Sequence, residues 1–339
     1  MPDIMPPEPP VLRVDDLTVR FRRRNIDVAA VNGVSFALAR GETLTILGES
    51  GSGKSVTLKA LMGLLPGFAE IDGRVWLEGK DLLALPPSEL SKLCGSAISM
   101  IFQEPMAALD PVYTIGAQIA ETVVQHEGVG RRAAMRRALD LLDHVKIPSA
   151  ARRLKNYPHE LSGGMRQRAM IALALACSPR VLLADEPTTA LDVSVQIQIL
   201  LLLRQLQQEL GMAIVFVTHD VGAAVEISDR IAVMYAGRFV ETASAREIMR
   251  TPRHPYTQGL LASIVHGGLR GKVLEMIPGA PPNLAQLPPG CAFAPRCRYV
   301  LDICRHGEVP VAMPSAGAMV RCVRAASEAP TPASNEVSA

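Results

Sequence analysis

The feature that most constrains the fold is the octapeptide GESGSGKS, from Gly48 to Ser55, which matches the pattern G-x-x-x-x-G-K-S/T. It follows the apolar run TLTIL, typical of a strand, and precedes VTLKALMGLL, typical of a helix. Glycines let such a loop curl so that backbone N–H groups point inward, and the following helix adds the positive end of its dipole. The context favours a phosphate-binding loop over a Gly/Ser-rich turn that merely joins a strand to a helix.

A loop of this kind needs partner side chains for the metal ion and the attacking water. Lys54 is expected to reach the β- and γ-phosphates of a nucleotide, and the Ser55 hydroxyl is expected to ligate Mg²⁺. The segment VLLADEP supplies Asp185 as a second Mg²⁺ ligand and Glu186 as the base that polarises water. Acidic pairs at strand ends are often only solvated caps, but the phosphate-binding loop favours catalysis. The predicted contacts from the loop are Gly48, Glu49, Ser50, Gly51, Ser52, Gly53, Lys54, Ser55 and Val56.

Size and charge exclude several other classes of protein. The 339 residues can bury a large core, and 35 Lys and Arg nearly balance 33 Asp and Glu, so no overall charge favours nucleic acid. The longest apolar runs are shorter than the roughly 18 residues that a bilayer span needs. The start, MPDIMPPEPP, lacks the basic and apolar parts of a secretory signal. We therefore expect a cytosolic location and cysteines that form no disulfides.

The pattern along the chain predicts an α/β fold with several parts. Short apolar runs such as RVLLAD and AIVFVTH alternate with helical stretches, which indicates a mostly parallel sheet. VLRVDDLTVRF near the start has the two-residue period of an antiparallel sheet packed beside it. Residues 112–157 are mainly helical, and Pro and Cys become frequent after about residue 250. The expected parts are a disordered tail at 1–10, a main domain at 11–250 with a helical insertion at about 104–160, a separate appendage at 251–324 and a disordered tail at 325–339.

The string LSGGMRQR at 161–168, ahead of Asp185 and Glu186, makes the chain resemble the ATP-binding-cassette (ABC) ATPases. The resemblance implies a P-loop NTPase core like that of RecA, with an antiparallel β subdomain and an inserted helical subdomain. It also implies that Ser162, Gly163 and Gly164 face a nucleotide held by the other subunit of a head-to-tail dimer. The family most often has Gln where this chain has Met165. The methionine lacks the polar side-chain contact of Gln, but the backbone N–H donors remain.

Four further positions match the order of motifs in the cassette family. By resemblance, Gln103 in MIFQEP senses Mg²⁺ and the attacking water, and is counted among the Mg²⁺ ligands. Asp192 in TTALD crosses the dimer interface, and His219 in VFVTHD contacts the γ-phosphate. Phe21 in LTVRF is the best match to the aromatic ring that stacks on adenine. Taken alone, a histidine or phenylalanine at such a place is more often structural.

Three strings narrow the resemblance to one branch of the family. MIFQEPMAALDP is similar to the peptide and nickel importers, and RHPYTQGLL and IPGAPPNLAQLPPGCAFAPRC are similar to the C-terminal extension of oligopeptide and dipeptide transporter ATPases. This implies an ATP-hydrolysing subunit of a bacterial peptide importer, peripheral on the cytoplasmic face of the inner membrane. Its partners would be a second, related cassette ATPase, two permeases and, indirectly, an extracytoplasmic peptide-binding protein.

Two other functions and several cargoes stay open at this point. A soluble cassette ATPase acting on nucleic acid or ribosomes usually carries two cassettes or a long coiled-coil or zinc insertion, and neither occurs in this sequence. A redox-sensing regulator that uses ATP as a switch is the other alternative. Dipeptides, oligopeptides, glutathione-like and opine-like compounds are all compatible with the sequence.

Four of the six cysteines lie in the last part of the chain: Cys291, Cys297, Cys304 and Cys322. Four thiolates in a Pro-rich segment can surround a metal centre, although the C-x-x-C pairs usual for zinc are missing. The resemblance implies a 4Fe–4S cluster, while zinc and unligated thiols stay open. Cys94 and Cys177 are expected to be small buried apolar residues.

Overall fold

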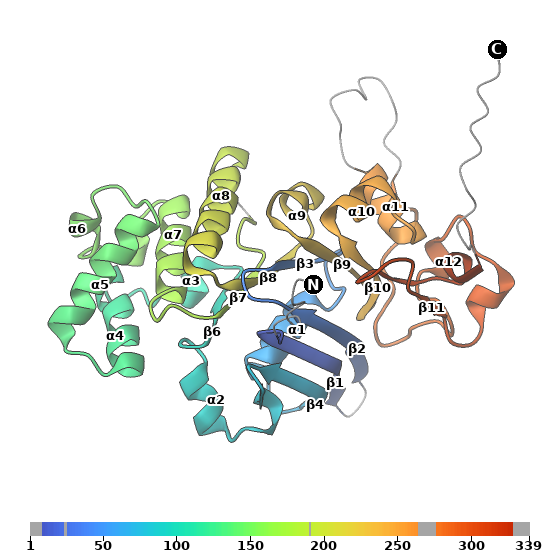
Figure 1. The fold of residues 1–339 in the computed structure, drawn as a ribbon, viewed down its shortest axis with the longest axis horizontal. Coiled ribbons are helices and arrows are strands. Elements are labelled where there is room, and N and C mark those ends of the chain that lie inside the picture. Colours follow the sequence, from blue (N-terminus) through green and yellow to red (C-terminus); the bar gives the residue numbers. More distant parts are fainter. Residues whose placement is uncertain (1–8, 24–25, 190, 264–275, 328–339) are drawn as a thin grey trace, which may run out of the picture.

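The chain forms a large eight-stranded sheet and a smaller four-stranded sheet, with helices around both (Figure 1). The computed structural model describes residues 9–23, 26–189, 191–263 and 276–327. Most of the two tails predicted to be disordered, at 1–10 and 325–339, lies outside the described residues. Within the described part of the chain, no helix is long and apolar enough to span a membrane.

Five parallel strands form the centre of the large sheet. All five are almost fully buried because helices cover one face and the smaller sheet with one helix covers the other, which explains their continuous apolar sequences. The order of strands in the whole sheet is β11-β12-β10-β9-β3-β8-β7-β6, which places β3 between β9 and β8. The parallel strands are β3 (Thr43–Leu47), β6 (Ile98–Ile101), β7 (Val181–Asp185), β8 (Ala213–Thr218) and β9 (Arg230–Tyr235).

The smaller sheet is antiparallel, as predicted, and has the order β2-β1-β4-β5. Its buried side chains share one apolar core with one side of the large sheet and with α1 (Lys54–Leu61). This packing fixes α1, and therefore the loop before it, between the two sheets. The strands are β1 (Leu12–Arg23), β2 (Ile26–Leu38), β4 (Ala69–Leu77) and β5 (Lys80–Asp81), followed by α2 (Pro87–Leu93).

A group of helices lies at the end of the molecule where β6 and β7 are, at the left in Figure 1. Buried Ala134, Ala138 and Leu142 on α5 allow close packing within this group. The group contains the predicted helical insertion and α7. Its helices are α3 (Pro105–Ala108), α4 (Ile115–Glu127), α5 (Arg131–His144), α6 (Ala150–Arg153) and α7 (Gly163–Ala174), with α8 (Val193–Leu210) and α9 (Val221–Ile227) following along the chain.

The C-terminal segment joins the large sheet, although the sequence led us to expect a separate appendage. β12 (Met319–Arg321) pairs with β10 (Arg238–Ser244), and β11 (Val311–Ala312) pairs with β12. Side chains from the segment share a third apolar core with β9, which includes Tyr235 and Phe293. Strands of two and three residues are too short to show a period in the sequence. The helices at this end are α10 (Ala245–Arg250), α11 (Pro255–Ala262) and α12 (Val323–Ser327).

Candidate functional site

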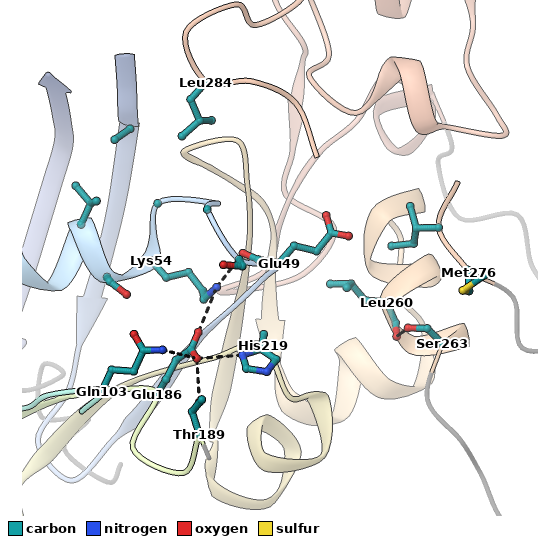
Figure 2. A pocket seen from close by; sticks show the side chains of 17 residues that line it. Glu49, Lys54, Gln103, Glu186, Thr189, His219, Leu260, Ser263, Met276 and Leu284 are labelled. Carbon is teal, nitrogen blue, oxygen red and sulfur yellow. Dashed lines mark hydrogen bonds and ion pairs between the residues drawn. The ribbon is translucent and has the colours of Figure 1, made fainter. Parts of the chain in front are cut away.

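A cavity of about 910 Å³ lies over the loop between β3 and α1 (Figure 2). One part of its wall comes from the phosphate-binding loop and from residues that follow β6, β7 and β8. The C-terminal segment supplies another part, which the sequence analysis did not foresee. The lining residues are Ala30, Glu49, Ser50, Gly51, Gly53, Lys54, Ser55, Val56, Gln103, Glu186, Thr189, His219, Leu260, Ser263, Met276, Ile277 and Leu284.

Two glycines of the loop are required by their surroundings. Gly53 has a φ of 107°, and a Cβ placed there would lie 2.3 Å from the carbonyl oxygen of Ala30. A Cβ on Gly48 would lie 2.3 Å from the carbonyl oxygen of Met234. Any side chain at these positions would force the backbone to move. The glycines therefore let the loop pass close to β2 and β9.

Lys54 is held inside the loop, with 4% of its surface exposed. Its Nζ donates hydrogen bonds to the carbonyl oxygens of Gly48 at 2.8 Å and Glu49 at 2.9 Å. Burial lowers the pKa of Lys54, while the nearby carboxylates of Glu186 and Asp185 act in the opposite direction. The ammonium group thus lies beside the cavity, where it can exchange carbonyl oxygens for phosphate oxygens.

Ser55 and Asp185 form a pair of oxygen donors at the base of the cavity. The Ser55 hydroxyl donates a 2.7 Å hydrogen bond to the Asp185 carboxylate. Burial raises the pKa of Asp185, and this hydrogen bond opposes the shift. Hydroxyl and carboxylate oxygens are suitable ligands for Mg²⁺, which also keeps several waters. These two residues fit the metal that accompanies a nucleotide.

Glu186 lies at the centre of a polar cluster just after β7 (Figure 2). Its carboxylate accepts hydrogen bonds from the Thr189 hydroxyl at 2.9 Å and the Gln103 amide at 3.5 Å, and its Oε2 lies 3.1 Å from Nδ1 of His219. Lys54 Nζ lies 3.8 Å from the other carboxylate oxygen. The structure therefore brings the three predicted catalytic residues together. Thr189 was not predicted, although its place three residues after Glu186 was a usable signal.

The other predicted residues lie away from the lining of this cavity, as far as the described residues show. Ser162 begins α7, where its hydroxyl accepts a hydrogen bond from the N–H of Met165, and Gly163 and Gly164 form the first turn. Asp192 precedes α8 and is exposed. Phe21 lies on β1, with its ring 6.0 Å from that of Phe68. The roles of these residues stay predictions.

The four C-terminal cysteines line one small cavity of about 20 Å³, together with His254 and Phe293. Burial raises the pKa of Cys291 to about 11, so this group is a neutral thiol at pH 7 without a metal. No group of three or more His, Cys, Asp or Glu in the described ranges is placed to hold a metal ion. The cavity that the four thiols line is large enough for about one water molecule.

The sequence matches two protein families. Residues 31–189 match the ABC transporter family, and residues 240–304 match the C-terminal region of oligopeptide/dipeptide transporters. The chain is 47% identical over 318 residues to the oligopeptide transport ATP-binding protein OppD of Salmonella typhimurium, covering 94% of this chain and 95% of that protein. The chain belongs to the ABC transporter family. The OppD protein of Escherichia coli is 49% identical over 294 residues, with 87% of each chain covered.

A solved structure supports the same assignment for the fold of the cassette. A dimer of the ATP-binding cassette MJ0796, in a post-hydrolysis state with ADP and Pi, matches with a TM-score of 0.63 at 29% sequence identity. The match covers 69% of this chain and 99% of that one. The prediction of an ABC cassette with a P-loop core is therefore confirmed.

Proposed function

We propose that this chain is the ATP-hydrolysing subunit of an ABC importer for di- or oligopeptides. The observation that carries the proposal is the meeting of Lys54, Ser55 and Glu186 at one cavity, with Asp185 bonded to Ser55. The C-terminal segment of the same chain matches the oligopeptide transporter region. The relatives named as oligopeptide transport proteins support the same cargo class. The subunit would act at the cytoplasmic face of the inner membrane with two permeases and, indirectly, a peptide-binding protein.

The geometry suggests how the residues of the site divide the work of hydrolysis. Lys54 and the N–H groups of the loop hold the phosphates, and Glu186 accepts a proton from the water that attacks the γ-phosphate. His219 and Gln103 fix the Glu186 carboxylate, so the base needs little reorientation. Mg²⁺ bound by Ser55 and Asp185 would neutralise charge on the phosphate oxygens.

A second cassette is required to complete the site. The sequence contains one phosphate-binding loop and one LSGG string, and Ser162 to Gly164 do not line the cavity of their own chain. The exposed start of α7 supplies N–H groups suited to a phosphate on another subunit. We propose a head-to-tail pair with a related but different ATPase, in which Asp192 lies at the interface.

Peptide uptake in the source bacterium tests the proposed cargo. A strain lacking this gene and auxotrophic for leucine should fail to grow on leucyl peptides, and the wild-type gene should restore growth. Glu186→Gln should not restore it, whereas Glu226→Gln, an exposed change on α9, should. Growth on peptides without the gene would contradict peptide import, and uptake of glutathione or opines in the same strains tests the other cargoes.

We also propose that Cys291, Cys297, Cys304 and Cys322 bind a 4Fe–4S cluster. The support is that all four thiols line one cavity, which must widen to admit a cluster. Protein purified without oxygen should be brown, and each Cys→Ser change should bleach it. Cys94→Ser, outside the set, should keep the colour. Zinc without iron would refute the cluster and keep the metal site, and the absence of both metals would refute the site.

A further inference from the structure

An arginine of the C-terminal segment forms an ion pair with the phosphate-binding loop. Arg296, the residue before Cys297, donates from Nη1 to Glu49 Oε2 at 2.7 Å and from Nη2 to Oε1 at 3.0 Å. Its side chain is 5% exposed, and its Nε donates to the carbonyl oxygen of Pro278 at 2.9 Å. Two parallel bonds to one carboxylate fix both distance and orientation, which a single charge contact does not.

The same segment also holds the backbone of Glu49. The N–H of Glu49 donates a 3.0 Å hydrogen bond to the hydroxyl of Tyr256 on α11. The carbonyl oxygen of Glu49 accepts from Lys54, the residue that reaches for phosphate. Tyr256 is fully buried against Tyr235 and Phe293, so its hydroxyl has a fixed position. Glu49 is therefore held by two side chains, those of Tyr256 and Arg296, that lie more than 200 positions later in the sequence.

The charge of Glu49 gives this contact a consequence for ATP. Glu49 lines the nucleotide cavity, although its side chain extends away from Lys54 in Figure 2. A carboxylate without a partner at this place would repel the triphosphate and would compete for Lys54. A guanidinium stays protonated in proteins, so the paired hydrogen bonds from Arg296 neutralise the Glu49 carboxylate.

We propose that Arg296 is a positioning residue for ATP binding, which neutralises Glu49 and, with Tyr256, fixes the start of the phosphate-binding loop. Nucleotide affinity then depends on the C-terminal segment as well as on the cassette motifs. The inference goes beyond the proposed import function and does not need it, because it concerns binding by the purified chain. It does not require a metal at the cysteines.

Calorimetric titration of the full chain with MgADP tests the proposal without turnover. Arg296→Ala should weaken binding about tenfold, because it leaves the Glu49 charge beside the phosphates. Glu49→Gln should strengthen binding about threefold, because it leaves an uncompensated guanidinium near the phosphates. The double variant Arg296→Ala/Glu49→Gln should return to within about threefold of the wild type. Arg305→Ala, an exposed arginine of the same segment, is the matched control.

The rescue separates electrostatic positioning from a general structural role. If Arg296 only stabilised the fold, the double variant would bind as weakly as Arg296→Ala, and that result would overturn the proposal. Unchanged affinity in Arg296→Ala would also overturn it. Should Arg296→Ala fail to fold, Arg296→Lys keeps the charge and loses the paired geometry. Arg296→Lys should then weaken MgADP binding about threefold, and this loss of affinity should be smaller at high salt. Wild-type affinity in Arg296→Lys would count against the proposal.

Discussion

Glu186 is the residue on which we expect hydrolysis to depend most directly, because Gln103, Thr189 and His219 all direct hydrogen-bonding groups at its carboxylate. We predict that Glu186→Gln lowers turnover by a factor of about 100 or more, since an amide keeps the shape but cannot accept the proton. Nucleotide binding should be retained. The measurement is phosphate release with the second cassette present, compared with direct ATP titration, and near-normal release would remove Glu186 from the role of base.

Lys54 should affect an earlier step than Glu186. Its ammonium group lies beside the cavity, so we expect it to contact the phosphates as soon as the nucleotide binds. We predict that Lys54→Ala weakens ATP binding by at least about tenfold, with the loss visible in equilibrium titration. Lys92→Ala, an exposed change in the last turn of α2, is the control. Equal affinities of the Lys54 variant and the wild type would contradict the assignment of the loop.

At the residue scale, the sequence predicted which side chains lie together, because each of them belongs to a short string with fixed neighbours. Lys54, Asp185 and His219 each follow or adjoin a parallel strand, and the carboxyl ends of such strands meet at one edge of the sheet. Arg296 could not be predicted in the same way. Its pairing with Glu49 depends on how the C-terminal segment folds back, which no local pattern encodes.

At the scale of structural elements, the packing of the C-terminal segment depends on one aromatic side chain, that of Phe293. Phe293 is 4% exposed, and its ring contacts those of Tyr235, Tyr256 and His254. We predict that Phe293→Ala costs about 3 to 5 kcal/mol of local stability, the usual range for a buried Phe→Ala change. Limited proteolysis should then cut within 276–327 first, while the cassette core stays resistant because the buried residues of its two larger apolar clusters all lie outside that segment.

Met313→Ala provides the control for this prediction, because Met313 is 71% exposed and its loss leaves no buried space. Cleavage of the Phe293 variant at the same rate as the wild type would show that the aromatic contacts do not hold the segment.

The helices and strands themselves were predicted unevenly. Apolar runs such as TLTIL were long enough to indicate strands, whereas β11 and β12 owe their pairing to the neighbouring β10.

On the scale of the whole molecule, the exposed start of α7 and the incomplete cavity predict assembly that depends on nucleotide. Glu186→Gln with the second cassette and MgATP should elute as a stable complex in gel filtration, because bound ATP is shared and not hydrolysed. Ser162→Arg should abolish the complex, since a large side chain at the start of α7 would block the approach of phosphate. A complex equally stable without ATP would contradict a shared nucleotide.

The place of β3 in the large sheet also determines when the nucleotide site can form during synthesis. Thr43 pairs with Ile214 of β8, and Leu44 pairs with Arg230 of β9, so both neighbours of the strand are made much later. Ribosomes add roughly 5 to 20 residues per second, which leaves the strand without partners for on the order of ten seconds or more. Such distant pairings also make folding slow. The loop at 48–55 is thus the first motif to leave the ribosome and one of the last to reach its working shape, so the nascent chain emerges unable to bind ATP.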